Sequence, residues 1–133
     1  MDTRTLLDSY YAHLANDEFA EAAALFRDEG DIIWSIPGKG PLAGKYETKA
    51  DIEKALARLG SGQYGEIRRP MHAYCLADDG EHVCAQYLLR MVRGDEVCDV
   101  VAIDAWHIDG DRLAEVWTFF ETLYDFDAWT SSS

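Results

Sequence analysis

The sequence predicts an α+β domain in which N-terminal helices cover one face of a mostly antiparallel sheet. Two observations predict this class. In the first sixty residues, apolar side chains recur at the spacing of amphipathic helices, whereas the second half contains long strand-like segments separated by turn sequences. Helices that precede an antiparallel sheet pack on one of its faces. The 133 residues suffice for one core and are too few for two, so we expect a single domain, residues 1–133.

Three helices are expected in the first sixty residues. The first runs from Thr3 to about Ala15, where apolar residues recur with the period of an amphipathic helix. The second follows a cap at Asn16 or Asp17. The third begins at the capping-box sequence TKAD (Thr48–Asp51), and it ends at Gly60.

The composition excludes several classes of function. Asp and Glu outnumber Lys and Arg by 25 to 12, which gives a net charge of −13. Binding to nucleic acid or to an anionic membrane needs a basic surface, so neither is an expected partner. No apolar run approaches the roughly 20 residues of a membrane helix. The first residues do not have the pattern of a signal peptide, so the cytoplasm is the expected location.

No cofactor or metal site is predicted. The sequence GSGQYG at residues 60–65 matches the dinucleotide-binding pattern GxGxxG, but it follows a helix, whereas that pattern must follow a strand. The sequence GKGPLAGK has the wrong glycine spacing for a phosphate loop. The four histidines lack the spacing of metal ligands. We therefore expect any chemistry to depend on side chains alone.

The register of one hairpin is determined by its turn. If Gly94 and Asp95 form a two-residue loop, the turn fixes every cross-strand pair of the flanking strands. One face of this hairpin is apolar apart from a carboxylate and a phenol, and carries the pairs Met91–Cys98, Leu89–Val100, Tyr87–Ala102, Ala85–Asp104 and Val83–Trp106. Helices should cover this face. Asp104 is therefore expected to point into the space between the helices and the sheet.

A carboxylate in that position requires an explanation, because burying an unpaired charge costs several kcal/mol. One explanation is catalytic: apolar surroundings raise the pKa of an aspartate above its ordinary value of about 3.9, which suits a general acid or base. The other is structural: Asp104 would be held by Tyr87, by Tyr46 or by a backbone N–H. The residues alone favour neither explanation.

The layout as a whole resembles a known family. Two helices, the sequence WSIPGKGPLAG, a third helix, and the sequences LADDGEHVCA and AWHIDGDRLAEVWTFFETLYDFDAW are together similar to the SnoaL-like group of the nuclear-transport-factor-two superfamily. The resemblance covers nearly the whole chain. It implies a cone-shaped, strongly curved sheet that wraps around the N-terminal helices and encloses an internal pocket. Members include polyketide cyclases, ketosteroid isomerases, dehydratases and limonene epoxide hydrolases, so the fold does not determine the function.

The resemblance also indicates which family residues are missing. In the cyclases, a His and an Asp that do acid–base work occupy the positions that match Asp104 and Thr118. The triad of the epoxide hydrolases is absent, so epoxide hydrolysis is not expected. The base of the ketosteroid isomerases would fall near Trp34 or Ser35, where no acid stands. Asp104 is the one ionisable group left in the expected pocket position.

The inner face of the last strand depends on the loop before it. A two-residue loop at Asp109 and Gly110 would turn the odd-numbered residues 115–121 inward, whereas one extra residue would turn Thr118 and Phe120 inward. The resemblance favours the second register.

These observations predict a site. Asp104 would move a proton, while Tyr87 with Ser35 or Thr118 would donate hydrogen bonds to the substrate oxygen that gains charge. The predicted substrate-binding residues are Trp34, Ser35, Tyr74, Trp106 and Phe120.

The predicted function is that of a cofactor-independent enzyme of the polyketide cyclase, isomerase or dehydratase type, acting on a small hydrophobic carbonyl compound, with natural-product biosynthesis as one setting. The alternative is a non-catalytic small-molecule-binding or dimerisation module. A homodimer is expected through the sheet face that carries Arg90, Leu88, Gln86, Val101 and Ile103.

Overall fold

The computed structural model describes residues 2–70, 72–77 and 79–132. The helices of these residues are α1 (Thr3–Ala15), α2 (Phe19–Ala24), α3 (Lys49–Leu59) and α4 (Leu123–Ser131). The strands are β1 (Ile33–Ile36), β2 (Gly44–Tyr46), β3 (Glu66–Arg68), β4 (His72–Leu76), β5 (His82–Arg93), β6 (Glu96–Asp109) and β7 (Arg112–Phe120).

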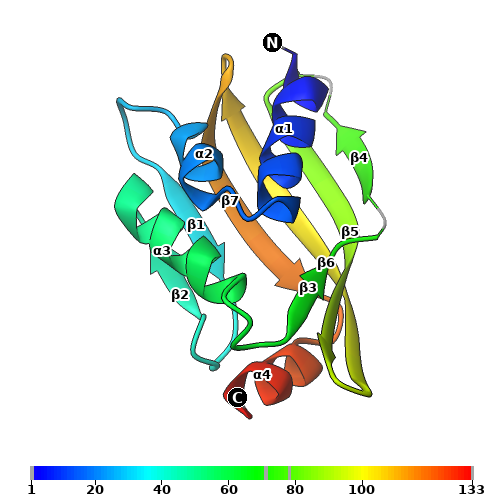
Figure 1. Cartoon of the computed structure of the whole chain (residues 1–133). Helices are drawn as coiled ribbons and strands as arrows, with labels where there is room; N and C mark the ends of the chain where they lie inside the picture. Colours follow the sequence, from blue (N-terminus) through cyan, green and yellow to red (C-terminus); the bar gives the residue numbers. More distant parts are fainter. Residues whose placement is uncertain (1, 71, 78, 133) are drawn as a thin grey trace.

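The strands form one curved, open sheet in the order β2-β1-β7-β6-β5-β3, and β4 pairs with β5 beside β3. The pair β1–β7 is parallel and the other pairs are antiparallel. Helices α1, α2 and α3 lie on one face of the sheet, and α4 lies at one end of it (Figure 1). The predicted class, an α+β fold with a curved sheet around the N-terminal helices, is confirmed.

Local signals explain where α1 and α3 begin. The Asp2 carboxylate accepts a hydrogen bond from the Thr5 backbone N–H at 2.7 Å, and the Thr48 hydroxyl accepts one from the Asp51 N–H at 3.1 Å. The predicted capping box of the third helix is therefore confirmed at its N-cap. None of the helices in the described part of the chain is long and apolar enough to cross a membrane.

The predicted cap of the second helix is wrong. The N-cap of α2 is Glu18, whose side chain makes no capping hydrogen bond. Asn16 instead ends α1, where its side-chain amide donates to the Ala12 carbonyl at 3.0 Å. Asp17 has a positive φ of 58° and forms the turn between the helices. An Asx residue favours such a left-handed turn as much as a cap, which is why the sequence pattern was ambiguous.

The long hairpin β5–β6 has the predicted register. Met91 lies opposite Cys98, Ala85 lies opposite Asp104, and the pairs between and beyond them follow as expected. The apolar face of the hairpin is buried under the helices, where it forms the core together with the apolar faces of α1 and α3.

The register of β7 follows the second alternative. A register shift between His107 and Ile108 places Thr118 opposite Asp104. Thr118 is 5% exposed and lies on the inner face, whereas Trp117 and Phe119 are 37% and 53% exposed on the outer face. The extra residue that causes this shift lies within β7 and not in the turn between β6 and β7.

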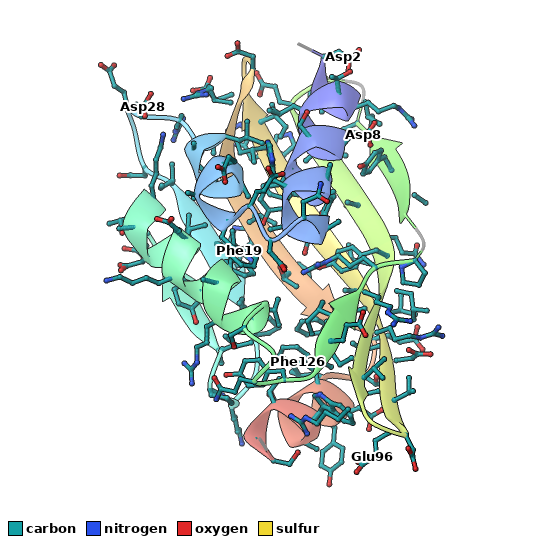
Figure 2. All side chains as sticks on the ribbon, viewed as in Figure 1. Asp2, Asp8, Phe19, Asp28, Glu96 and Phe126 are labelled. Atoms are coloured by element: carbon teal, nitrogen blue, oxygen red, sulfur yellow. The ribbon has the colours of Figure 1, made fainter. Side chains whose placement is uncertain are left out.

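Helix α4 closes one end of the space between the helices and the sheet. Phe126 of α4, which is labelled in Figure 2, stacks on Phe120 of β7 with ring centroids 4.0 Å apart. The Trp129 indole N–H donates to the Tyr64 carbonyl at 2.7 Å. The C-terminal segment thus packs against its own domain.

Two glycines near β3 offer a test of how closely β3 packs on β5. Gly62 and Gly65 both have φ of +91°, but a Cβ at Gly62 would meet open space, whereas one at Gly65 would collide with the Val92 backbone carbonyl. Gly62→Ala should lower the free energy of unfolding by about 1–2 kcal/mol through backbone strain. Gly65→Ala should cost roughly 1–3 kcal/mol more because of the collision. Urea denaturation of both variants measures the difference, and equal losses would contradict this packing of β3 on β5.

Candidate functional site

The centre of the candidate site is the carboxylate of Asp104, which is 5% exposed in the middle of β6. Three hydroxyl groups donate hydrogen bonds to it from three different elements. The Tyr11 hydroxyl on α1 lies 2.6 Å from Oδ2. The Thr118 hydroxyl on β7 and the Tyr87 hydroxyl on β5 lie 2.7 Å and 3.2 Å from Oδ1. Asp104 is thus buried but not unpaired.

Two tryptophans set the direction of these hydrogen bonds. The Trp34 indole N–H donates to the Thr118 hydroxyl oxygen at 3.0 Å, and the Trp106 indole N–H donates to the Tyr11 hydroxyl oxygen at 3.0 Å. An indole nitrogen can only donate. The hydroxyls of Thr118 and Tyr11 therefore accept from the indoles, and their own protons point to Asp104. Two chains of donors end on one carboxylate, an arrangement that favours its ionised form.

Burial and hydrogen bonding act on Asp104 in opposite directions. Burial raises the pKa of Asp104, while the hydrogen bonds from Tyr11 and Thr118 and the positive charge of Arg69 lower it, and the net pKa lies above the ordinary value. This is the direction that the sequence predicted. Burial, reinforced by the Asp104 charge, also raises the pKa of Tyr11 and of Tyr87 well above the usual range. Both phenols therefore stay protonated and remain donors.

Asp104 lines a small inner cavity of about 20 Å³ between the helices and the sheet. That volume holds about one water molecule. Its wall is mainly apolar, with polar atoms from Tyr10, Trp34, Arg69, Tyr87, Asp104 and Thr118. The predicted internal pocket is therefore present, but it is much smaller than a pocket that encloses a whole ligand.

A second hollow, which we name the vestibule, has a volume of about 350 Å³. It is lined by the C-terminal ends of α1 and α3 and by strand β3, whose arrangement Figure 1 shows. Phe19, which is labelled in Figure 2, forms part of its wall. Leu14, Leu56, Leu59 and Arg69 line both the vestibule and the inner cavity. These four side chains separate the two hollows.

Arg69 is the site residue that sequence reasoning missed. Its guanidinium carbon lies 5.9 Å from the centre of the Tyr87 ring, and its Nε–H is buried without a hydrogen-bond partner among the described residues. The alternation of Glu66, Ile67 and Arg68 could have placed Arg69 on the inner face. A strand of three residues, however, is too short for that pattern to be recognised.

The structure brings together most of the predicted site residues. Asp104, Tyr87, Thr118, Trp34 and Trp106 form one hydrogen-bonded cluster with Tyr11. The hydroxyls of Tyr87 and Thr118 donate to Asp104, so these protons are not free for a substrate oxygen, which corrects the role first assigned to them.

Three predicted residues lie apart from this cluster. Phe120 lines the inner cavity but stacks on Phe126. Tyr74 stacks beside Tyr11 and donates to the Asp8 carboxylate at 2.8 Å, outside the cavity. Ser35 lies on the opposite face of β1 from Trp34, because neighbouring strand residues point to opposite sides, so it cannot reach Asp104.

Tyr46, considered as a structural partner of Asp104, does not reach it. Its hydroxyl donates to the Leu42 carbonyl at 2.6 Å. That function belongs instead to Tyr11, which the sequence suggested for the pocket wall but not as a partner of Asp104. The periodicity of a helix shows which residues are buried, but it does not show which side chain 93 positions away they contact.

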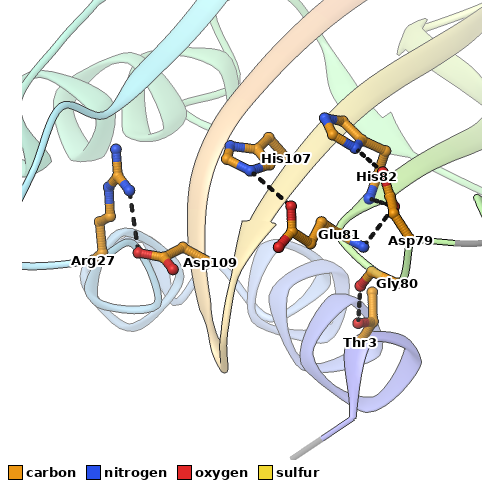
Figure 3. A network of polar contacts seen from close by, with 8 residues as sticks. All are labelled: Thr3, Arg27, Asp79, Gly80, Glu81, His82, His107 and Asp109. Carbon is orange, nitrogen blue, oxygen red and sulfur yellow. Dashed lines mark hydrogen bonds and ion pairs between the residues drawn. The ribbon is translucent and has the colours of Figure 1, made fainter.

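Another polar cluster lies at the turn between β4 and β5 (Figure 3). Asp79, Glu81 and His82 could each offer one metal ligand, and their ligand atoms lie within 4.8 Å of one another. All three are exposed, and Asp79 already accepts hydrogen bonds from the backbone N–H groups of Glu81 and His82. The His82 ring also pairs with the Asp79 carboxylate at 2.7 Å. These contacts account for the cluster as a turn-stabilising network.

Comparison with known proteins identifies the fold. No family model matches the sequence, and no curated protein matches it. Solved structures do match. Bal32a, from a soil-derived mobile gene cassette, has 20% sequence identity and a TM-score of 0.84, over 96% of this chain and 95% of that one. An NTF2-like protein from Burkholderia xenovorans LB400 has 18% identity and a TM-score of 0.75, over 96% and 93%. The chain has the NTF2-like fold.

A third match concerns the kinds of protein that share the NTF2-like fold. A protein from Pseudomonas putida KT2440, named provisionally as a polyketide cyclase, has 16% identity and a TM-score of 0.72, over 98% of both chains. At such identities the likeness establishes the NTF2-like fold and leaves the chemistry to the site itself. The resemblance found in the sequence is therefore confirmed at the level of the fold.

The donor chain through Thr118 can be tested by stability. Thr118→Val keeps the shape but removes the donor to Asp104 and the acceptor of Trp34, so the free energy of unfolding should fall by about 1–3 kcal/mol. Trp34→Phe should then cost less in the Thr118→Val protein than in the wild type, because its indole has already lost its partner. Urea denaturation of the two single variants and the double variant measures this coupling.

Thr122→Val is the matched control, because Thr122 is exposed and its hydroxyl makes no capping hydrogen bond. It should leave stability nearly unchanged. Strictly additive effects of Thr118→Val and Trp34→Phe would contradict the directed chain.

Proposed function

We propose that the protein is a cofactor-independent enzyme that performs acid–base chemistry of the cyclase, isomerase or dehydratase type on a small hydrophobic carbonyl compound. The observation that carries this proposal is a buried carboxylate with a raised pKa on the wall of a cavity that adjoins a ligand-sized vestibule. Perturbed carboxylates in such positions are the usual general acids and bases of enzymes.

The proposed step is proton transfer to Asp104. Its Oδ1 accepts two hydrogen bonds, whereas Oδ2 accepts one, from Tyr11, among the described residues. Oδ2 therefore keeps a lone pair that can take a proton from a carbon next to a carbonyl group. Tyr11, Tyr87 and Thr118 act as positioning residues, because they hold the carboxylate and stabilise its charge before the reaction. The negative charge that develops on the substrate needs a different partner.

A binding module remains the second candidate, because one observation favours it. The inner cavity of about 20 Å³ admits only a small group past Arg69. In that case the Asp104 network would stabilise the core, and the vestibule would bind a small hydrophobic molecule without turnover.

The two candidates differ in a measurement that does not require the natural substrate. Small ketones and 1,3-diketones exchange their α-protons in D₂O when a base removes them, and proton NMR follows that exchange. The wild-type protein should accelerate exchange for part of such a panel, and Asp104→Asn should lower the rate by about a hundredfold or more. Asp99→Asn is the matched control, because Asp99 lies on β6 and pairs with Arg90 near the surface. Equal rates for the wild type and Asp104→Asn, or no exchange above background, would favour the binding module.

We also propose a homodimer through the outer sheet face, as the sequence suggested. Ile103, Trp117 and Phe119 expose large apolar surfaces on that face, and the Arg90–Asp99 ion pair lies beside them. Exposed apolar patches of this kind mark contact surfaces.

Light scattering should give about twice the chain mass of 15.0 kDa, and Ile103→Asp should shift the measured mass to that of the monomer. Tyr124→Asp, at an exposed position on α4, should leave the dimer intact, and a wild-type monomer at micromolar concentration would contradict the proposal.

A further inference from the structure

Arg69 lies at the boundary between the vestibule and the inner cavity that Asp104 lines. It lines both hollows, while the other residues shared by them are leucines. It is the only cation among the residues that line either hollow in the described part of the chain. A ligand that enters this site therefore meets one positive charge, at the point where the wide hollow narrows to the small one.

One hydrogen-bond donor of Arg69 has no partner among the described residues. This donor is the Nε–H, which is buried. Leaving such a donor unpaired destabilises the protein, and the effect is larger when the group is charged. The face of the Tyr87 ring holds the guanidinium group in place. A donor that is positioned but unpaired is suited to an acceptor that arrives from outside.

The charge of Arg69 is opposite in sign to the net charge of the protein. The protein carries a net charge of −13, so its general field repels anions. The acids of the vestibule, Asp17 and Glu66, are both exposed, and Glu66 pairs with Arg68 at 2.8 Å. Their charges are therefore screened by water more than the charge of Arg69, which acts beside a buried cavity.

From this arrangement we propose that Arg69 binds an oxygen anion of the ligand, at the boundary between the vestibule and the inner cavity. The proposal rests on the proposed function and identifies the partner that it lacked: Arg69 binds the substrate oxygen that becomes negative when Asp104 takes a proton. The volumes support this placement. The vestibule has room for a substituted ring, whereas the inner cavity has room for about one small group, so the reacting end of the ligand lies beside Arg69.

The same oxygen chemistry can come from an enolate formed in the reaction or from a carboxylate that the ligand carries from the start. In both cases the Nε–H and the neighbouring N–H groups of Arg69 offer the planar set of donors that such an oxygen accepts. The substrate class is accordingly a compact, largely apolar molecule with an enolisable carbonyl or an acid group at one end.

A binding experiment tests this inference without any turnover. The probes are 4-nitrophenolate as the enolate mimic, 4-nitrobenzoate as the carboxylate, and 4-nitroanisole as the neutral match, each titrated at a pH where the two anions are ionised. We expect at least one anion to bind about tenfold or more tightly than 4-nitroanisole, and the tighter anion identifies the source of the oxygen. Arg69→Gln should remove that preference and leave 4-nitroanisole binding unchanged, while Arg69→Lys should keep part of it because the charge remains.

Arg68→Gln is the matched control, since it changes the net charge equally at the neighbouring, exposed position. It frees the exposed charge of Glu66 but leaves Arg69 in place, so it should keep the preference for the anions over 4-nitroanisole. Equal affinity for anions and 4-nitroanisole, or equal losses in Arg68→Gln and Arg69→Gln, would overturn the inference. The proposed function and this inference can fail separately. Asp104→Asn should slow proton exchange about a hundredfold or more, whereas it should preserve or strengthen anion binding, because the competing carboxylate is gone.

Discussion

The burial of one carboxylate is the constraint on which the centre of this domain depends. Moving a carboxylate out of water costs several kcal/mol unless hydrogen bonds compensate for the lost hydration. Hydroxyl groups on α1, β5 and β7 provide that compensation, and two indoles orient two of them. The helix layer and the sheet are therefore joined by a polar network as well as by apolar packing. The side chains that share this task are Tyr11, Trp34, Tyr87, Trp106 and Thr118.

The register of the last two strands decides whether this network can form. Next to the turn, Ile108 pairs with Leu113. If this register continued along both strands without a shift, Trp117 would lie opposite Asp104. The register shift after His107 places Thr118 there instead. One extra residue in β7 thus replaces an indole by a hydroxyl at the carboxylate, and it turns Trp117 to the outer face. The same irregularity creates the donor inside and the apolar patch outside.

Local signals predict the fold well because they are strong here. A capping box begins α3, a two-residue turn fixes the β5–β6 register, and that register places Asp104 on the buried face. The site is less predictable, because its contacts join residues that are distant in the sequence. Neither the hydrogen bond from Tyr11 to Asp104 nor the position of Arg69 between two hollows follows from a local pattern. The hairpin register identified Asp104 and the resemblance to cyclases favoured a functional role for it, but the role of its neighbours required the geometry of their hydroxyl groups.

Directed hydroxyl donors hold a buried carboxylate whose pKa is nevertheless raised. The most direct measurement is a carbon-13 NMR titration of the Asp104 carboxyl group in the wild type and in the Thr118→Val and Thr122→Val variants. The wild-type pKa should lie above the ordinary value of 3.8. It should rise further in Thr118→Val, because that variant loses a donor that stabilises the charged form, and it should not change in Thr122→Val. A wild-type pKa below 3.8, or a pKa that Thr118→Val leaves unchanged, would contradict the claim.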